Sequence, residues 1–202
     1  MYVPSFYQED RRDILLETIR SKSFGTLITQ GANGIDVTHL PFAVEGDALV
    51  GHVARANPQW ERMTPGSEAV ATFVIDDAYI HPGWYPSKIE HGRAVPTWNY
   101  IAVEARGTLE WLHGGDALRP VLDRLTADQE ASRNDPWGIN DAPDAYIEGM
   151  LKAIVGFRLT LTDLSGAWKL DQKKKDADRL AAADGVAVER PHSSLPEKMR
   201  AV

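Results

Sequence analysis

The stretch EAVATFVIDDAYI, at residues 68–80, decides the fold. It is mostly apolar and rich in β-branched and aromatic residues, which is typical of a strand with both faces buried. A strand of this kind belongs in the interior of a sheet. We therefore predict a central strand over residues 68–80, with its neighbours on either side along the chain.

Shorter strands are expected before it. They read TLIT at 26–29, VTHLPFAV at 37–44 and ALVGHVA at 48–54. The turn signals GANG and EGD separate them, so an antiparallel meander is predicted. Ahead of the meander, Ser5 and Gln8 have the spacing of a capping box, and apolar residues recur behind them. This pattern predicts a first helix over residues 5–22.

The second half of the chain resumes the meander after a loop at 81–96 that is rich in Pro, Gly and Trp. Strands are expected at 100–112 and 154–166, and helices at 116–131, 143–153 and 176–183. Strands outnumber helices, and the helices lie at the ends and in one insertion. The predicted class is mainly β (α+β), a small barrel with peripheral helices. We expect one domain over 1–187 and a poorly ordered tail over 188–202.

Composition excludes several classes of protein. The chain has no cysteine, which excludes disulfides, iron–sulfur clusters and a cysteine nucleophile. The net charge of -7 argues against broad binding to nucleic acid, which depends on Lys and Arg. No apolar run reaches the roughly 20 residues that cross a bilayer, and no signal peptide is recognisable. We therefore expect no membrane association and a cytoplasmic location.

Catalytic and metal-binding motifs are missing as well. The six histidines include no close pair on a helix face, so no metal site is predicted. The sequence has no GxSxG elbow, Walker A loop or GxGxxG fingerprint, which removes the hydrolase, NTPase and Rossmann interpretations. His39 and His52 lie in adjacent predicted strands, where they either bind a ligand or form hydrogen bonds to the backbone.

Polar and aromatic residues gather in three stretches, at 51–60, 81–100 and 168–172. A phosphorylated aromatic cofactor needs cations or N–H groups for its phosphate and flat surfaces for its ring. Arg55 and Asn57 are candidates for the phosphate. The ring candidates are Trp84, Tyr85, Trp98 and Tyr100, with Lys88 and Lys169 supplying positive charge. The alternative is that the aromatic side chains form core and the cations are solvated.

Several motifs in register resemble a known family. They are HLPF at 39–42, GHVARANPQW at 51–60, AYIHPGWYPSK at 78–88, VPTWNY at 95–100, IVGF at 154–157 and KLDQ at 169–172, with MYVP at 1–4 and LTADQE at 125–130. Together they resemble the PaiB-type FMN-binding negative transcriptional regulators. The family usually has small polar residues at the positions of His81 and Asp171, where this chain departs from the pattern.

This resemblance implies an FMN-binding split β-barrel, related to the pyridoxamine-phosphate-oxidase-like flavoproteins, that forms a homodimer with FMN at the subunit interface. The implied FMN-binding residues are Thr38, His39, Leu40, Pro41, His52, Arg55, Ala56, Asn57, Trp84, Tyr85, Lys88, Thr97, Trp98, Asn99, Tyr100, Lys169 and Gln172. The first eight would serve the phosphate side and line the ring, and the others would close the site, partly from the partner subunit.

Three functions remain open. The first is regulation, either by direct DNA binding, for which the basic run at 173–175 is the best candidate, or indirectly through redox or another protein. The second is an FMN-dependent oxidoreductase that uses NAD(P)H or a small substrate, because the flavin itself carries such chemistry. The third is haem binding or breakdown, since some relatives with this fold handle haem.

Overall fold

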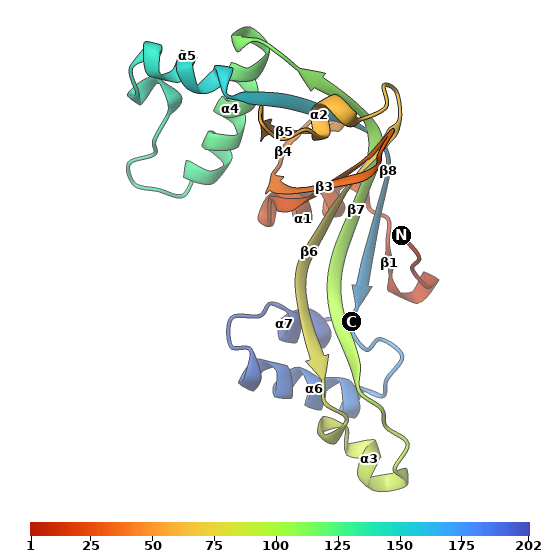
Figure 1. Cartoon of the computed structure of the whole chain (residues 1–202). Helices are drawn as coiled ribbons and strands as arrows, with labels where there is room; N and C mark the ends of the chain where they lie inside the picture. Colours follow the sequence, from red (N-terminus) through yellow and green to blue (C-terminus); the bar gives the residue numbers. More distant parts are fainter. The chain divides into compact units, whose positions relative to one another are not determined.

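The computed structural model describes all 202 residues, and they form two compact units. The terminal unit comprises residues 1–15, 74–103 and 165–202, and the barrel unit comprises residues 16–73 and 104–164. Three long strands continue from one unit into the other: β6 (Glu68–Ile80), β7 (Thr97–Leu112) and β8 (Ile154–Lys169) (Figure 1). The fold is the split β-barrel that the sequence predicts.

The strands form one sheet in the order β3-β2-β6-β7-β8-β5-β4, and β1 pairs with β8. The remaining bounds are β1 (Gln8–Glu9), β2 (Phe24–Gly31), β3 (Gly34–Pro41), β4 (Ala43–Glu45) and β5 (Ala48–Ala54). Strand β6 has the predicted bounds and lies in the interior of the sheet. The prediction that both of its faces are buried is wrong, however, because buried residues alternate with more exposed ones and Val74 is 59% exposed. Only one face of the strand packs on the core.

Seven α-helices accompany the sheet: α1 (Arg12–Ser21), α2 (Gln59–Arg62), α3 (Pro86–His91), α4 (Gly115–Glu130), α5 (Asp144–Lys152), α6 (Asp176–Glu189) and α7 (Leu195–Arg200). There are also three 3₁₀ turns: η1 (Ser5–Tyr7), η2 (Pro82–Trp84) and η3 (Ile139–Asp141). None of the helices is long and apolar enough to cross a membrane.

The first predicted helix needs correction. It begins at Arg12 instead of Ser5, because Gln8 and Glu9 pair with Ala167 and Gly166 of β8. The predicted loop at 81–96 contains η2 and α3, and the predicted cap Asp116 lies inside α4, whose N-cap is Gly114. These errors concern short elements and helix starts, which depend on local signals that distant contacts override.

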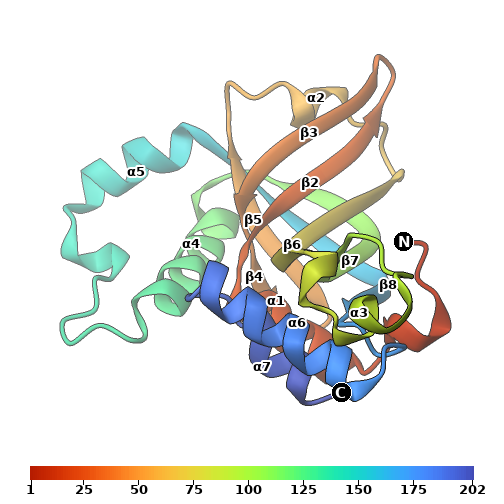
Figure 2. The ribbon, with the colours of Figure 1, turned by 90° about the horizontal axis from the view of Figure 1, so that it is seen from below.

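The barrel unit is held by an aromatic core. The Phe42 ring contacts Phe73 and Phe157 edge to face, with ring centroids 5.1 and 5.6 Å apart, and all three side chains are at most 1% exposed. Helices α4 and α5 lie beside one another (Figure 2) and bury a separate group formed by Leu118, Ile139, Ile147 and Leu151. This packing fixes the end of α5 against the start of β8.

The terminal unit has its own core around α6 and α7, which lie side by side (Figures 1 and 2). Tyr85 is 1% exposed there, and Leu195 and Met199 of α7 are fully buried. Helix α7 lies in the segment 188–202, for which the sequence gives no periodicity. Its two apolar anchors, one turn apart, explain why a helix forms there.

Candidate functional site

The predicted site residues divide between the two units. Thr38, His39, Leu40, Pro41, His52, Arg55, Ala56 and Asn57 belong to the barrel unit. Trp84, Tyr85, Lys88, Thr97, Trp98, Asn99, Tyr100, Lys169 and Gln172 belong to the terminal unit.

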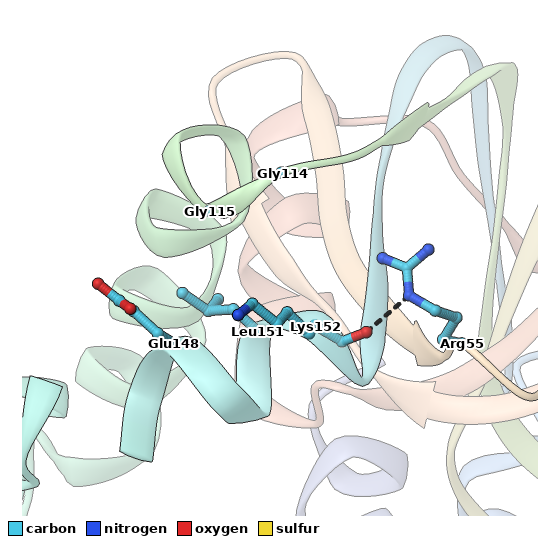
Figure 3. A pocket seen from close by; sticks show the side chains of 6 residues that line it. All are labelled: Arg55, Gly114, Gly115, Glu148, Leu151 and Lys152. Carbon is cyan, nitrogen blue, oxygen red and sulfur yellow. Dashed lines mark hydrogen bonds between the residues drawn. The ribbon is translucent and has the colours of Figure 1, made fainter. Parts of the chain in front are cut away.

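Arg55 follows β5 and closes the carboxyl end of α5. Its Nε donates a hydrogen bond to the carbonyl of Lys152 at 2.7 Å (Figure 3), and one terminal nitrogen donates to the carbonyl of Ile154 at 2.9 Å. Its backbone N–H reaches the carbonyl of Ala153 at 2.8 Å. The last carbonyls of a helix lack partners within the helix and carry negative partial charge, so a guanidinium stabilises them. The other terminal nitrogen has no partner.

A pocket of about 290 Å³ opens beside this guanidinium (Figure 3). Besides Arg55, it is lined by Gly114, Gly115, Glu148, Leu151 and Lys152. Gly114 has a φ of 88°, a conformation that favours glycine, and no side chain caps the helix that begins after it. The pocket thus combines two cationic side chains with the positive end of a 16-residue helix. Glu148 is the single acidic side chain of the lining.

Thr38 and Asn57 bond to each other and to Gln59, which is 1% exposed. The Thr38 hydroxyl donates to Oε1 of Gln59 at 2.5 Å, and Nδ2 of Asn57 donates to the same hydroxyl at 2.8 Å. The amide of Gln59 also reaches Oγ1 of Thr29 at 3.1 Å. This network fixes the turn after β5 and leaves few polar atoms of Thr38 and Asn57 for a ligand.

The two histidines of the barrel unit differ in their surroundings. Nδ1 of His39 lies 2.9 Å from the hydroxyl of Thr26, on the exposed side of β3. His52 in β5 is half-buried, and its Nδ1 is fully buried without any hydrogen-bond partner. Burial lowers the pKa of His52, so the ring stays neutral. The nearby Leu40 is buried, Pro41 is half-buried and Ala56 is exposed.

In the terminal unit, Lys169 bonds to the first residues of β7. Its ammonium donates to the hydroxyl of Thr97 at 2.5 Å and to the carbonyl of Trp98. Burial lowers the pKa of Lys169, and the nearby Asp171 carboxylate works against that shift. Thr97, Trp98 and Lys169 therefore lie together in the structure.

Asp171, one of the departures from the family pattern, is 4% exposed and accepts a hydrogen bond from the Tyr85 hydroxyl at 2.9 Å. Its φ of 62° makes it the single non-glycine residue with a positive φ. Burial and the Asp171 carboxylate raise the pKa of Tyr85, which keeps the phenol a donor. The ammonium of Lys174 lies 4.5 Å from the Tyr85 ring centre. Tyr85 is thus a core residue anchored by a carboxylate.

Two predicted aromatic residues share a shallow pocket of about 270 Å³. Trp84 and Trp98 line it together with Tyr79, and Trp98 is 53% exposed. The Trp84 ring lies against α6, where a Cβ at Gly185 would come within 2.3 Å of it. This pocket therefore presents flat aromatic surface.

The remaining predicted residues of the terminal unit range from fully buried to exposed. Asn99 is fully buried, its Oδ1 has no partner, and its Nδ2 lies 3.6 Å from the Met199 sulfur. Gln172 bonds to the backbone N–H of Leu170 and to the carbonyl of Trp168. Tyr100 is half-buried, and Lys88 is exposed.

Two features of the barrel unit were missed from the sequence. Gln59 stands inside the quoted motif GHVARANPQW, and its place in the network is visible only once β2 and β3 approach it. Lys152, Gly114 and Gly115 lie far from Arg55 in the chain, and no sequence signal joins them to it.

Comparisons with known proteins identify the family of the chain. Residues 1–163 match the family described as "Putative FMN-binding domain". The chain is 31% identical over 182 residues to the protease synthase and sporulation protein PAI 2 of Bacillus subtilis, which covers 88% of this chain and 85% of the relative.

Solved structures show the same fold. The FAD and haem binding protein of Mycobacterium smegmatis aligns with a TM-score of 0.60 and 18% identity, over 87% of this chain and 80% of its own. The flavocytochrome Anf3 of Azotobacter vinelandii aligns with a TM-score of 0.54 and 14% identity, over 83% and 72%. The predicted family, fold and cofactor are confirmed: the chain belongs to the PaiB-like family of FMN-binding split β-barrels.

Proposed function

We propose that this chain is a cytoplasmic homodimer that binds FMN at the subunit interface and regulates indirectly, through the flavin or a protein partner, without reading DNA itself. The observation that carries the cofactor part is the pocket beside Arg55. The name of the Bacillus subtilis relative, which links that protein to protease synthesis and sporulation, supports the regulatory part.

The residues around Arg55 fit a phosphate. A dianionic group needs several N–H donors in a positive field, and the pocket offers a terminal guanidinium nitrogen without a partner, the Lys152 ammonium and the uncapped start of α4. Since Arg55 is already held by two carbonyls, its free edge is fixed before any ligand arrives. Preorganisation of this kind lowers the entropy cost of binding.

Other predicted residues suit the rest of FMN. His52 is half-buried, so part of its ring remains open to a ligand. In the terminal unit, Trp84 and Trp98 offer aromatic surface, and Lys169 offers positive charge. Bound FMN would supply reversible electron transfer, and these residues would bind and orient it.

An exposed apolar edge favours a homodimer. Strand β3 stands at the end of the sheet order, and its Ile35 and Val37 are 68% and 56% exposed. Phe24 of the neighbouring β2 is 61% exposed. An edge strand with exposed apolar residues tends to pair or to be covered by another chain.

The basic run at 173–175 supports indirect regulation. Lys173 lies 3.6 Å from the centre of the Phe6 ring, Lys174 lies over Tyr85, and Lys175 is 3.8 Å from the carboxylate of Glu90. Two of the three lysines in the strongest sequence candidate for DNA contact thus lie over aromatic rings of their own unit, on a chain whose net charge is -7.

Electrophoretic mobility measurements test this proposal. The FMN-loaded protein should give no specific shift with the DNA upstream of its own gene at moderate salt, and it should show no sustained NAD(P)H consumption with a panel of acceptors. A specific shift would contradict indirect regulation and indicate direct repression. Sustained turnover would favour the oxidoreductase alternative.

A further inference from the structure

Trp60 contacts Arg55 in two ways. Its indole Nε1 donates a hydrogen bond to the backbone carbonyl of Arg55 at 2.9 Å. The guanidinium carbon of Arg55 lies over the Trp60 ring, 6.0 Å from its centroid, which is the outer limit of a cation–π contact. Trp60 does not line the pocket beside Arg55. Any influence that it has on a ligand in that pocket is therefore exerted through Arg55.

The Trp60 side chain is itself held by residues that are remote in the chain. It belongs to α2, whose first residue, Gln59, is 1% exposed and accepts a hydrogen bond from the hydroxyl of Thr38 at 2.5 Å. The rings of Trp60 and His113 meet edge to face, with centroids 5.5 Å apart. These contacts fix the Trp60 ring independently of Arg55, so the ring can serve as a support for the guanidinium.

Arg55 needs such a support because it is exposed and stands in the turn after β5, and surface turns are usually mobile. Its backbone N–H donates to the carbonyl of Ala153, and its own carbonyl accepts from Trp60. Its side chain adds hydrogen bonds to the carbonyls of Lys152 and Ile154. The residue is thus held at both backbone polar groups and at its side chain, which leaves one terminal nitrogen for a ligand.

The nature of these contacts favours an anionic ligand. The groups that hold the Arg55 guanidinium are two neutral carbonyls and an aromatic ring. None of them is a carboxylate, so they orient the guanidinium without neutralising its charge. A carboxylate in the place of the ring would compete with a phosphate for the same cation.

We propose that Trp60 is a positioning residue for the phosphate of FMN: it fixes the direction in which the free nitrogen of Arg55 faces the pocket. A phosphomonoester then meets a guanidinium that loses little conformational freedom on binding. This inference rests on the proposed phosphate pocket and assigns to that pocket a residue that does not touch the ligand.

Matched variants of the full chain test this role by calorimetry with FMN. Trp60→Leu removes both the donor and the ring, and it should weaken FMN binding about tenfold, the effect of one hydrogen bond. Trp60→Phe keeps a ring and should weaken binding about threefold, and it preserves the test if the first variant does not fold. Trp137→Leu, at an exposed tryptophan of the same unit, should leave the affinity unchanged.

A double variant separates positioning from a general effect on the fold. In the Arg55→Ala background, Trp60→Leu should change FMN affinity by less than about twofold, because the residue that Trp60 positions is gone. A purely structural role would instead give losses that multiply.

Inorganic phosphate gives a spectroscopic measurement on the apo protein. The indole N–H signals of the six tryptophans are followed by ¹H–¹⁵N NMR at constant ionic strength, with sodium chloride as the control. The signal that is missing in Trp60→Phe should move as phosphate is added to the unaltered chain. It should stay in place in Arg55→Ala.

The inference is overturned by full FMN affinity in both Trp60 variants, by multiplying losses in the double variant, or by a Trp60 signal that does not respond to phosphate. If Arg55→Ala itself binds FMN normally, the phosphate pocket is wrong and the inference is overturned with it. A loss in Arg55→Ala without a loss in the Trp60 variants contradicts the positioning role alone.

Discussion

Arg55 carries two tasks that a single substitution can separate. Its Nε and one terminal nitrogen hold carbonyls at the junction of α5 and β8, and its remaining nitrogen faces a cationic pocket. The first task concerns stability, and the second concerns binding. Lys152 shares the pocket through its side chain, but only its backbone carbonyl takes part in the junction.

Arg55→Ala should therefore weaken FMN binding by about 2–4 kcal/mol and also lower the free energy of unfolding by about 1–3 kcal/mol, because two carbonyls lose a charged donor. Lys152→Ala should weaken FMN binding and leave unfolding nearly unchanged. Calorimetry with FMN and urea unfolding of the apo protein measure the two effects. Unchanged FMN affinity in both variants would show that the phosphate of FMN does not bind in this pocket.

His52 predicts a dependence of stability on pH. Burial lowers its pKa below the usual value near 6.5, so the unfolded chain takes up a proton that the folded chain refuses. The free energy of unfolding should be highest above pH 6.5 and should fall as the pH drops through that value towards 5. His52→Gln should flatten this part of the curve, whereas His192→Gln, at an exposed position, should not. Urea unfolding between about pH 5 and 8, the range in which histidines usually titrate, measures the slope of the unfolding free energy against pH for each variant.

At the scale of the elements, helix α7 is fastened to β6 by one carboxylate. Oδ2 of Asp76 accepts hydrogen bonds from the backbone and hydroxyl of Ser194, at 2.7 and 2.9 Å, and from the hydroxyl of Ser193 at 3.0 Å. Burial alone would raise the pKa of Asp76, but these bonds outweigh it and lower the pKa. The stabilisation is therefore fully present above the usual pKa of an aspartate, and it is lost as the pH falls through the lowered pKa of Asp76.

Asp76→Ala should loosen α7 and cost about 1–3 kcal/mol, because three donors lose their acceptor. The matched change Asp184→Ala breaks only an exposed pair with Arg200 and should cost under about 1 kcal/mol. Hydrogen exchange of residues 195–200 should rise strongly in the first variant alone. Equal exchange in both variants would show that the buried Leu195 and Met199 hold the helix without Asp76.

The elements also show what sequence alone can predict. Strands β5 and β6 have the predicted bounds because turn residues flank a dense β pattern on both sides. The start of α1 was wrong because the local signal at Ser5 lost to the pairing of Gln8 with Ala167, which is remote in the chain. Helix α7 could not be predicted because its stability comes from two buried side chains and from Asp76, far upstream.

In the candidate site, too, some features can be predicted from local sequence and others depend on remote contacts. The motifs identify Lys169, Thr97 and Trp98, and the structure brings these residues together. They do not reveal that the buried Tyr85 donates a hydrogen bond to Asp171. Nor do they reveal that the polar atoms of Thr38 and Asn57 form hydrogen bonds within the network of Gln59. Both facts depend on contacts between remote segments. Residue types can be read from a motif, but their free donors and acceptors cannot.

At the scale of the whole molecule, the central claim is that a homodimer of this chain binds FMN. Family membership supports the cofactor, and the exposed apolar residues of β3 favour a partner subunit. Each subunit has a mass of 22.4 kDa, so one measurement can address both parts.

The measurement is size-exclusion chromatography with light scattering and simultaneous absorbance, on protein incubated with FMN and then desalted. We predict one peak with a mass twice that of the 22.4 kDa chain, carrying flavin absorbance at one FMN per subunit. A monomer peak, or a dimer peak without flavin absorbance, would contradict it.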